Sequence, residues 1–394
     1  MTKSEYDNAV LKLIENIKEN KGKVIKFLSL YEPKITAIDE VERSVSTLRG
    51  LPEELSRCRF TQENVAAVFF PLNLPLYSLI LFAIAPAFFC EKVYVRCNKK
   101  MLDILDGVSY ILDMDMLFPQ IKLTNCNRSS FVYRYVKKMA DIVLFTGKYE
   151  NAMQVLRVCS DKLFILNGSG INPVVVCNDA DINQAVDKSY KMRLYNGGQD
   201  CAGPDVFFIH KDIFEEFVNK IIPKVKKTIC GTYGSDENLE VGPLLKDGYS
   251  EIVKEFLKRN RDKIVLEGSI EDDIVRPSII CKNIDEHSGE FDEFFAPIFY
   301  ILIYETEDQI LDLLNQNINN SMYLTYFSNI SRFDSFMAAT KIKNSIIDDV
   351  EQGNKQYGGY GKKANFISCN GVIESRPILL SREIDNYLKS KDFS

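Results

Sequence analysis

Short runs of β-branched and aromatic residues alternate with stretches of helical periodicity from residue 60 onward, and this alternation constrains the fold most. Strands separated by helices in this way are typical of parallel sheets. The sequence predicts strands at 65–70, 92–97, 141–147, 162–166, 173–177, 205–210, 274–280 and 299–304. It predicts helices at 77–85, 101–105, 151–158, 182–195, 213–226, 251–261 and 307–316. We therefore expect an α/β fold with parallel sheets.

The composition is that of a soluble enzyme and argues against several other classes. The 394 residues carry a net charge of −6, with Lys and Arg scattered among acids, so neither a nucleic-acid surface nor a basic membrane arm is indicated. Ten cysteines without a Cys-x-x-Cys pair, and an N-terminus without a secretory signal, predict free thiols and a cytoplasmic location. Because His210 and His287 are the only histidines, we expect neither a histidine zinc site nor a Ser-His-Asp triad, and no metal.

Residues 65–90 are apolar for long enough to cross a bilayer. Pro71 and Pro75 would break a membrane helix near its start, and Asn73 would place an unpaired amide in the lipid. We predict instead a strand at 65–70, a proline-bounded turn and a buried helix, with no membrane insertion.

Five short motifs, in this order along the chain, resemble the aldehyde dehydrogenase superfamily. Residues 71–75 (PLNLP) are similar to P-W-N-F-P, and residues 145–147 (FTG) to the F-T-G-S loop. Residues 165–186, which begin ILNGSGINP, resemble L-E-L-G-G-K-N-P-x-I-V followed by D-A-D. Residues 196–201 (NGGQDC) resemble N-x-G-Q-x-C, and residues 293–297 (EFFAP) resemble E-x-F-G-P. Each motif is weak alone, and their ordered combination is specific.

The resemblance implies a covalent mechanism on Cys201. Its sulfur would attack a carbonyl carbon and, after loss of hydride, would carry a thioester, which suits a thiolate nucleophile. Asn73 resembles the family's oxyanion donor, whose amide acts together with the backbone N–H of the cysteine. The other readings are an inert buried thiol for Cys201 and a turn residue for Asn73.

The resemblance also implies a nicotinamide cofactor, NAD or NADP. Arg96 stands where the family has a lysine near the adenine ribose, and its planar fork would accommodate a 2′-phosphate. Glu293 would bind the nicotinamide ribose, although within EFDEFF it could equally be a solvated acid. The residues expected to contact the cofactor are Leu72, Arg96, Thr146, Gly147, Lys148, Glu293 and Phe295.

The chain departs from the family at the general base, because Asn167 occupies the position of the glutamate in L-E-L-G-G. An amide cannot take a proton from water, so hydrolysis of the thioester should be slow. A thiol such as coenzyme A ionises more readily, and this predicts an acylating dehydrogenase or acyl-thioester reductase. One alternative is a hydrolytic enzyme in which Glu150 or Asp200 assists water. The other is a weak relative with a binding or assembly role.

The resemblance covers about residues 60 to 365 and implies two Rossmann-like α/β domains. We expect a cofactor domain at 1–169, a catalytic domain at 170–350, and a segment at 351–394 that returns to the first domain or to a subunit interface. Lys148 replaces a small hydroxyl residue and would either crowd the pyrophosphate or clamp it by charge. The expected partners are an aldehyde or acyl thioester and a second copy of the chain in a homodimer, but no nucleic acid.

Overall fold

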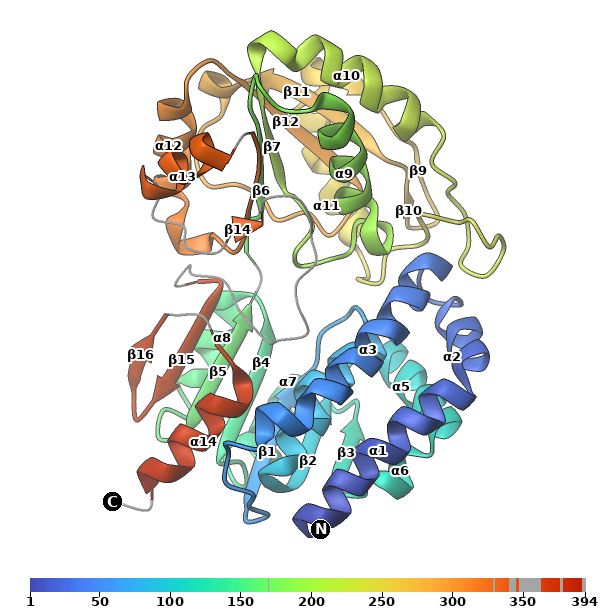
Figure 1. The fold of residues 1–394 in the computed structure, drawn as a ribbon, viewed down its shortest axis with the longest axis vertical. Helices are drawn as coiled ribbons and strands as arrows, with labels where there is room; N and C mark the ends of the chain where they lie inside the picture. Colours follow the sequence, from blue (N-terminus) through green and yellow to red (C-terminus); the bar gives the residue numbers. More distant parts are fainter. Residues whose placement is uncertain (169, 329, 340–344, 347–362, 376–377, 392–394) are drawn as a thin grey trace.

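The structure is a computed structural model that describes residues 1–168, 170–328, 330–339, 345–346, 363–375 and 378–391. Two seven-stranded sheets, each covered by helices, form two α/β units (Figure 1). The predicted α/β fold is therefore confirmed. Gly358 and Gly359, which resemble a late G-G turn of the same family, lie outside the described residues.

The first sheet has the strand order β16-β15-β5-β4-β1-β2-β3. Its strands β1 to β5 pair in parallel, whereas β15 is antiparallel to both β5 and β16. The bounds are β1 (Asn64–Phe69), β2 (Cys90–Arg96), β3 (Ile121–Thr124), β4 (Ile142–Gly147), β5 (Leu163–Gly168), β15 (Asn365–Cys369) and β16 (Val372–Glu374). The chain thus returns to this sheet after the second unit is complete.

The second sheet has the order β14-β13-β6-β7-β12-β11-β8, in which only β8 is antiparallel to its neighbour. Its bounds are β6 (Pro173–Val176), β7 (Val206–His210), β8 (Ile264–Leu266), β11 (Ser278–Asn283), β12 (Ile298–Tyr304), β13 (Leu324–Phe327) and β14 (Ser345–Ile346). The prediction of one strand at 274–280 was wrong. Pro277 has no N–H for a ladder and separates β11 from β10 (Ile274–Val275), which pairs with β9 (Ile270–Glu271).

Each of the seven predicted helices has a counterpart in the structure, most with shifted ends, and the other helices were not predicted. Their bounds are α1 (Lys3–Glu19), α2 (Lys21–Leu28), α3 (Lys34–Leu55), α4 (Pro75–Leu79), α5 (Lys99–Leu112), α6 (Met114–Leu117), α7 (Arg128–Phe131), α8 (Tyr149–Leu156), α9 (Ile182–Leu194), α10 (Lys211–Lys226), α11 (Tyr249–Arg259), α12 (Glu307–Gln316), α13 (Ile330–Ala339) and α14 (Leu380–Lys391). The helix expected at 101–105 is longer because the Asn98 side chain caps its start, accepting the Met101 N–H at 2.7 Å.

The apolar segment 65–90 forms the centre of the first unit. Strand β1 is buried along its length, and α4 continues into a π-helical turn at Ile80–Ile84 that is also buried. The predicted helix at 77–85 is therefore α-helical only in its first part. No helix in the described part of the chain is long and apolar enough to cross a membrane.

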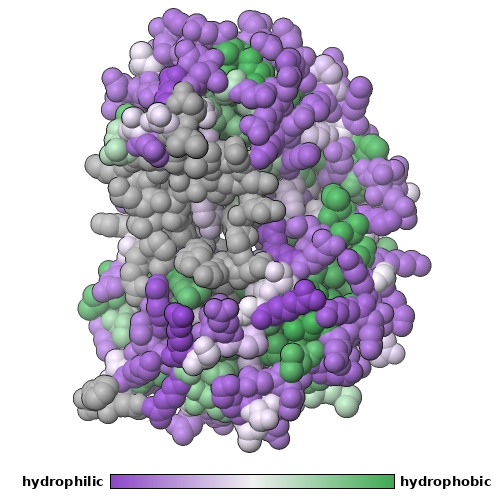
Figure 2. All heavy atoms as spheres, viewed as in Figure 1, coloured by the Kyte–Doolittle hydropathy of each residue, from purple (hydrophilic) through white to green (hydrophobic). Residues whose placement is uncertain are grey.

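The three N-terminal helices pack against this centre. Tyr6 of α1 donates its hydroxyl to the carbonyl of Ile84 at 2.9 Å, and Asn16 bonds the carbonyl of Leu112. Helix α3 crosses beside α4 and reaches the gap between the two units (Figure 1). On the face shown in Figure 2, the described surface is mostly hydrophilic, and apolar side chains form small separate groups.

Candidate active site

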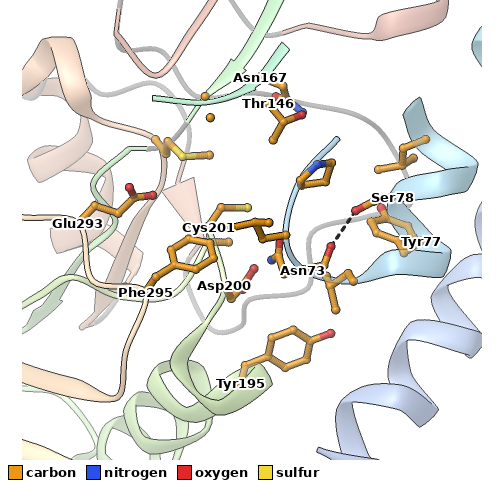
Figure 3. Close-up of a pocket in the computed structure, with 18 of the residues that line it drawn as sticks. Asn73, Tyr77, Ser78, Thr146, Asn167, Tyr195, Asp200, Cys201, Glu293 and Phe295 are labelled. Atoms are coloured by element: carbon orange, nitrogen blue, oxygen red, sulfur yellow. Dashed lines mark hydrogen bonds between the residues drawn. The ribbon is translucent and has the colours of Figure 1, made fainter. Parts of the chain in front are cut away.

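A pocket of about 670 Å³ is lined by residues of both units. The first unit contributes the segments that follow β1 and β4 and the end of β5. Ligands of open α/β sheets bind at these carboxyl edges. The second unit contributes α9, the loop after it and the segment before β12. The predicted residues that line the pocket are Leu72, Asn73, Thr146, Gly147, Lys148, Asn167, Cys201, Glu293 and Phe295 (Figure 3).

Arg96 is the one residue predicted to contact the cofactor that does not line this pocket. It ends β2, and its Nε donates to the carbonyl of Cys126 at 3.1 Å. Its guanidinium lies 6.0 Å from the centre of the Phe69 ring. The contact of Arg96 with an adenine ribose therefore stays a prediction.

Cys201 follows a tight turn at the end of α9. Asn196, Gly197 and Gly198 have φ angles of 51°, 64° and 81°, the left-handed region that glycine enters without steric strain. A Cβ on Gly198 would lie 2.7 Å from the nitrogen of Pro297. The close approach of these two segments needs a glycine, and it carries Glu293 and Phe295 to the pocket beside Cys201 (Figure 3).

A buried polar network below this loop was not predicted from the sequence. Arg193, with no exposed surface, donates to the carbonyls of Gly198 and Phe294 at 2.5 and 2.8 Å. The Asp205 carboxylate accepts the Phe294 N–H at 2.8 Å and the Asn172 N–H at 3.0 Å. Asn172 in turn donates to the carbonyl of Cys201 at 2.8 Å. These bonds fix the backbone on both sides of Cys201.

The surroundings of Cys201 favour a protonated thiol. Burial raises the pKa of Cys201 well above its ordinary value, and the negative charges of Asp200 and Glu293 raise it further. The Asp200 carboxyl contacts the thiol directly, and burial also raises the pKa of Asp200, against the opposing charge of Arg43. A cation bound beside Cys201 would therefore promote its ionisation.

Asn73 lies in the turn between β1 and α4, beside Cys201 in the pocket (Figure 3). The next residue, Leu74, has a φ of 48°, a strained value for a branched side chain, so neighbours must hold the turn. Ser78 donates to the Asn73 carbonyl at 3.1 Å, and the Tyr77 N–H donates to the buried Glu40 carboxylate at 2.9 Å.

Two lysines, Lys148 and Lys246, line the pocket together with Thr146 and Gly147. Lys148 occupies the N-cap position of α8, and Lys246 reaches the same cavity from the second unit. Burial lowers the pKa of Lys246, and the charge of Lys148 lowers it further, so an anion placed between them would be stabilised. This arrangement supports the clamping role of Lys148 over the crowding role.

The polar side chains at the other end of the pocket, around Tyr195, were also not predicted from the sequence. Arg43 of α3 pairs with Asp39 at 2.8 Å, and Tyr195 donates its hydroxyl to the same carboxylate at 2.5 Å. The Arg43 guanidinium lies 5.4 Å from the Tyr77 ring centre and 5.7 Å from that of Tyr195. Helix α3 precedes the region of family resemblance, so no motif marked Asp39 or Arg43.

Comparisons with known proteins agree with this geometry. A model described as the aldehyde dehydrogenase family matches residues 135–365. A lactaldehyde dehydrogenase of Methanococcus aeolicus is 24% identical, over 95% of this chain and 87% of its own length. The structure of glyceraldehyde-3-phosphate dehydrogenase GapN from Methanocaldococcus jannaschii complexed with NADP superposes with a TM-score of 0.81 at 20% identity, covering 96% of this chain and 90% of the other. Lactaldehyde dehydrogenase from Escherichia coli gives 0.79 at 16% identity, covering 96% and 86%.

Proposed function

The chain belongs to the aldehyde dehydrogenase family and is an oxidoreductase of that type, and we propose that it passes the acyl group of a Cys201 thioester to a thiol such as coenzyme A. The same steps in reverse would reduce an acyl thioester to an aldehyde. Asn167 carries the proposal, because it lines the pocket and its motif resembles the one in which the family has its general-base glutamate.

The reaction begins when the Cys201 sulfur bonds to the carbonyl carbon of the aldehyde. The negative charge that develops on the carbonyl oxygen would be held by the Asn73 amide and the Cys201 backbone N–H, and removal of one such donor costs about 3 kcal/mol of barrier. A nicotinamide cofactor, when bound, would supply the acceptor for the hydride of this carbon, and Cys201 would then hold the acyl group as a thioester. Attack by the second thiol then breaks the carbon–sulfur bond and frees Cys201.

NAD or NADP fits the residues present at the carboxyl edge of the first sheet. Gly147, the last residue of β4, has a φ of 139°, and α8 begins two residues later, so the free backbone N–H groups of the first turn of a helix lie next to these pocket residues. Lys148 and Lys246 would flank the pyrophosphate, and Glu293 would bind the ribose near Cys201. Which of the two cofactors is bound depends on Arg96, which lies outside this pocket.

The proposed transfer to a thiol rests on the absence of a carboxylate at residue 167. The acids that line the described part of the pocket are Asp39, Asp200 and Glu293, and none of them occupies the end of β5. An amide there cannot deprotonate water, whereas a thiol already supplies some thiolate at neutral pH. The acyl group on Cys201 should therefore persist until a thiol arrives.

The test measures NAD(P)H formed from an aldehyde with and without coenzyme A. Turnover that requires coenzyme A and disappears in Cys201→Ala is the expected result. Asn167→Glu, which restores the family's base, should gain turnover without coenzyme A, and Asn167→Gln is the matched control that should not. Equal turnover of the wild type with and without coenzyme A would overturn the proposal. No turnover in either condition would favour the binding or assembly role.

A hydrolytic reaction is the second candidate, and the position of Asp200 favours it. Asp200 lines the pocket in contact with the Cys201 thiol, whereas Glu150 does not line it. The raised pKa of Asp200 brings a carboxyl towards the range that suits a general base. If turnover without coenzyme A is abolished in Asp200→Asn while thioester formation continues, Asp200 is the base that replaces the missing glutamate.

A further inference from the structure

The pocket extends past Cys201 to an end that the proposed reaction does not explain. In Figure 3, Thr146 and Asn167 lie on one side of Cys201, and Tyr195 lies on the other. Tyr195 directly follows α9, and Lys188 and Lys191 precede it by seven and four residues. This spacing places both lysines on the Tyr195 face of the helix, and both line the pocket.

Neither lysine has an acidic partner in the described part of the chain. Other cations near α9 are paired, since Lys224 lies 2.7 Å from Asp187 and Lys220 bonds Asn183 at 2.7 Å. Asp39, the pocket acid on α3, already accepts from Arg43 and from Tyr195.

The positive charge of Lys188 and Lys191 contrasts with the negative charge of the whole chain. The protein carries a net charge of −6, yet five cationic and three acidic side chains line the pocket. Lys148 and Lys246 at the far end suit the cofactor pyrophosphate. Lys188 and Lys191 therefore leave a positive surplus at the end where the substrate chain would lie.

Apolar side chains line the pocket together with Cys201 and the two lysines. Leu74 and Leu81 come from the first unit, and Met192 comes from α9. A carbon chain would contact these side chains while its carbonyl reached Cys201, and a charged group at its end would lie near α9.

We propose that the substrate is an aldehyde, or the corresponding acyl thioester, whose chain ends in a carboxylate or a phosphate that Lys188 and Lys191 bind. This inference rests on the proposed function, because it takes Cys201 as the point of attack. The two ammonium groups bind the anion. The carbon chain that contacts the apolar side chains sets the distance between the anion and the carbonyl.

The experiment compares matched aldehydes with and without the anion. The pairs are 4-oxobutanoate with butanal, for the carboxylate, and glyceraldehyde 3-phosphate with glyceraldehyde, for the phosphate. The variant Lys188→Gln/Lys191→Gln should raise KM about tenfold for the preferred anionic aldehyde, a loss of about 1.4 kcal/mol of binding, and leave the neutral partner unchanged. Added salt should raise the KM of the anionic aldehyde and leave the KM of the neutral aldehyde unchanged, because the lysines are partly exposed to solvent.

Two control variants separate charge from structure. Lys188→Arg/Lys191→Arg keeps both charges and should retain the low KM. Lys254→Gln/Lys258→Gln removes the same charge from exposed positions of α11 that do not line the pocket, and should change nothing. Equal KM changes for anionic and neutral aldehydes, or no change for either, would overturn the inference.

Coenzyme A also carries phosphates, so its KM is measured in the same variants. A rise in the KM of coenzyme A with unchanged KM for the anionic aldehydes would assign the lysines to that molecule and overturn the inference. Calorimetric binding of 4-oxobutanoate to Cys201→Ala, with and without the lysine change, decides the matter even without turnover. Failure of the proposed function gives a different result: turnover that is equal with and without coenzyme A, or oxidation that survives Cys201→Ala.

Discussion

The buried carboxylate of Glu40 accepts the backbone N–H of Tyr77 at 2.9 Å and so joins α3 to the first turn of α4. Glu40 has no exposed surface, and the α4 turn that it holds begins immediately after the loop of Asn73 and Leu74. The strained φ of Leu74 is maintained only if this turn is fixed. Glu40 is therefore a positioning residue for the proposed oxyanion donor, although it does not line the pocket.

Replacement of Glu40 should test this role. Glu40→Leu removes the acceptor, and a shift of the Asn73 loop should lower kcat by about tenfold or more while KM changes less. Glu40→Gln keeps an acceptor oxygen and should retain most of kcat. Thr36→Val, one turn earlier on the same buried face of α3, is the control, since the Thr36 hydroxyl has no hydrogen-bond partner among the described residues. Unchanged kcat in the Leu variant, with melting confirmed as cooperative, would contradict the role.

The Glu32–Glu40 pair should make stability depend on pH. Burial raises the pKa of Glu40 to about 7, and burial together with the charge of Glu40 raises the pKa of Glu32 well above its ordinary value. Above the ordinary value of 4.5, the folded state then binds more protons than the unfolded state. The contribution to stability is complete below about pH 4.5 and is lost as pH rises through 7.

Urea unfolding between pH 5 and pH 8 measures this dependence. The free energy of unfolding should decrease across the range in the wild type, and the slope should be smaller in Glu32→Gln, which removes one titrating group of the pair. The paired surface acid Glu251 offers a control, because Glu251→Gln should leave the slope unchanged. A wild-type free energy that increases towards pH 8, with no change in Glu32→Gln, would contradict the assignment.

Many of the strands could be predicted because each forms a recognisable apolar run in the sequence. Strands β1, β4, β6 and β12 are continuous apolar runs, the pattern of strands buried on both faces. Strand β3 is four residues long and half-buried, so it has no such run and was missed. The pattern also could not show that β15 would pair with β5, because that contact joins residues about two hundred positions apart.

The candidate site likewise contains residues that the sequence predicted and residues that it did not. Cys201, Asn73 and Glu293 belong to motifs, and the structure brings all three to one pocket. Arg193 and Arg43 were missed because their roles depend on tertiary neighbours. Arg193 appears in the sequence as an ordinary basic residue near a helix end, where cations suit the dipole, and only the fold shows that it is fully buried.

Arg193 should be among the most important residues for stability. Its guanidinium bonds the carbonyls of Gly198, Pro204 and Phe294 and lies 3.9 Å from Asp205. Arg193→Met would leave three buried carbonyls without their donor and remove the cation beside Asp205, and it should lower the free energy of unfolding by about 3–5 kcal/mol. Burial already raises the pKa of Asp205 to about 8 against the charge of Arg193, so the loss should be smaller at low pH, where Asp205 is protonated.

Asp205→Asn in the Arg193→Met background is the informative control. It removes the charge that the single variant leaves uncompensated, so it should recover part of the lost stability at pH 8 and little at pH 5. The measurement is urea unfolding of the single and double variants at both values. A double variant less stable than Arg193→Met at pH 8 would show that Asp205 acts through its hydrogen bonds and not through its charge.

Removal of the acids around Cys201 should make the thiol more reactive. After burial itself, the charge of Asp200 is the largest contribution that raises the pKa of Cys201, followed by the charge of Glu293. Asp200→Asn should therefore lower this pKa and increase the thiolate fraction at pH 8, because less repulsion opposes the negative sulfur. Glu293→Gln should act in the same direction with a smaller effect.

Alkylation by iodoacetamide, followed for the Cys201 peptide by mass spectrometry, reports the thiolate fraction directly. The rate at pH 8 should rise several-fold in Asp200→Asn, and the pH at which the rate is half-maximal should fall. Cys159 is an internal control, since burial raises its pKa to about 12 and neither Asp200 nor Glu293 contributes. A slower alkylation of Cys201 in Asp200→Asn would mean that Asp200 assists ionisation by accepting the thiol proton, and it would strengthen the hydrolytic candidate in which this carboxylate is the base.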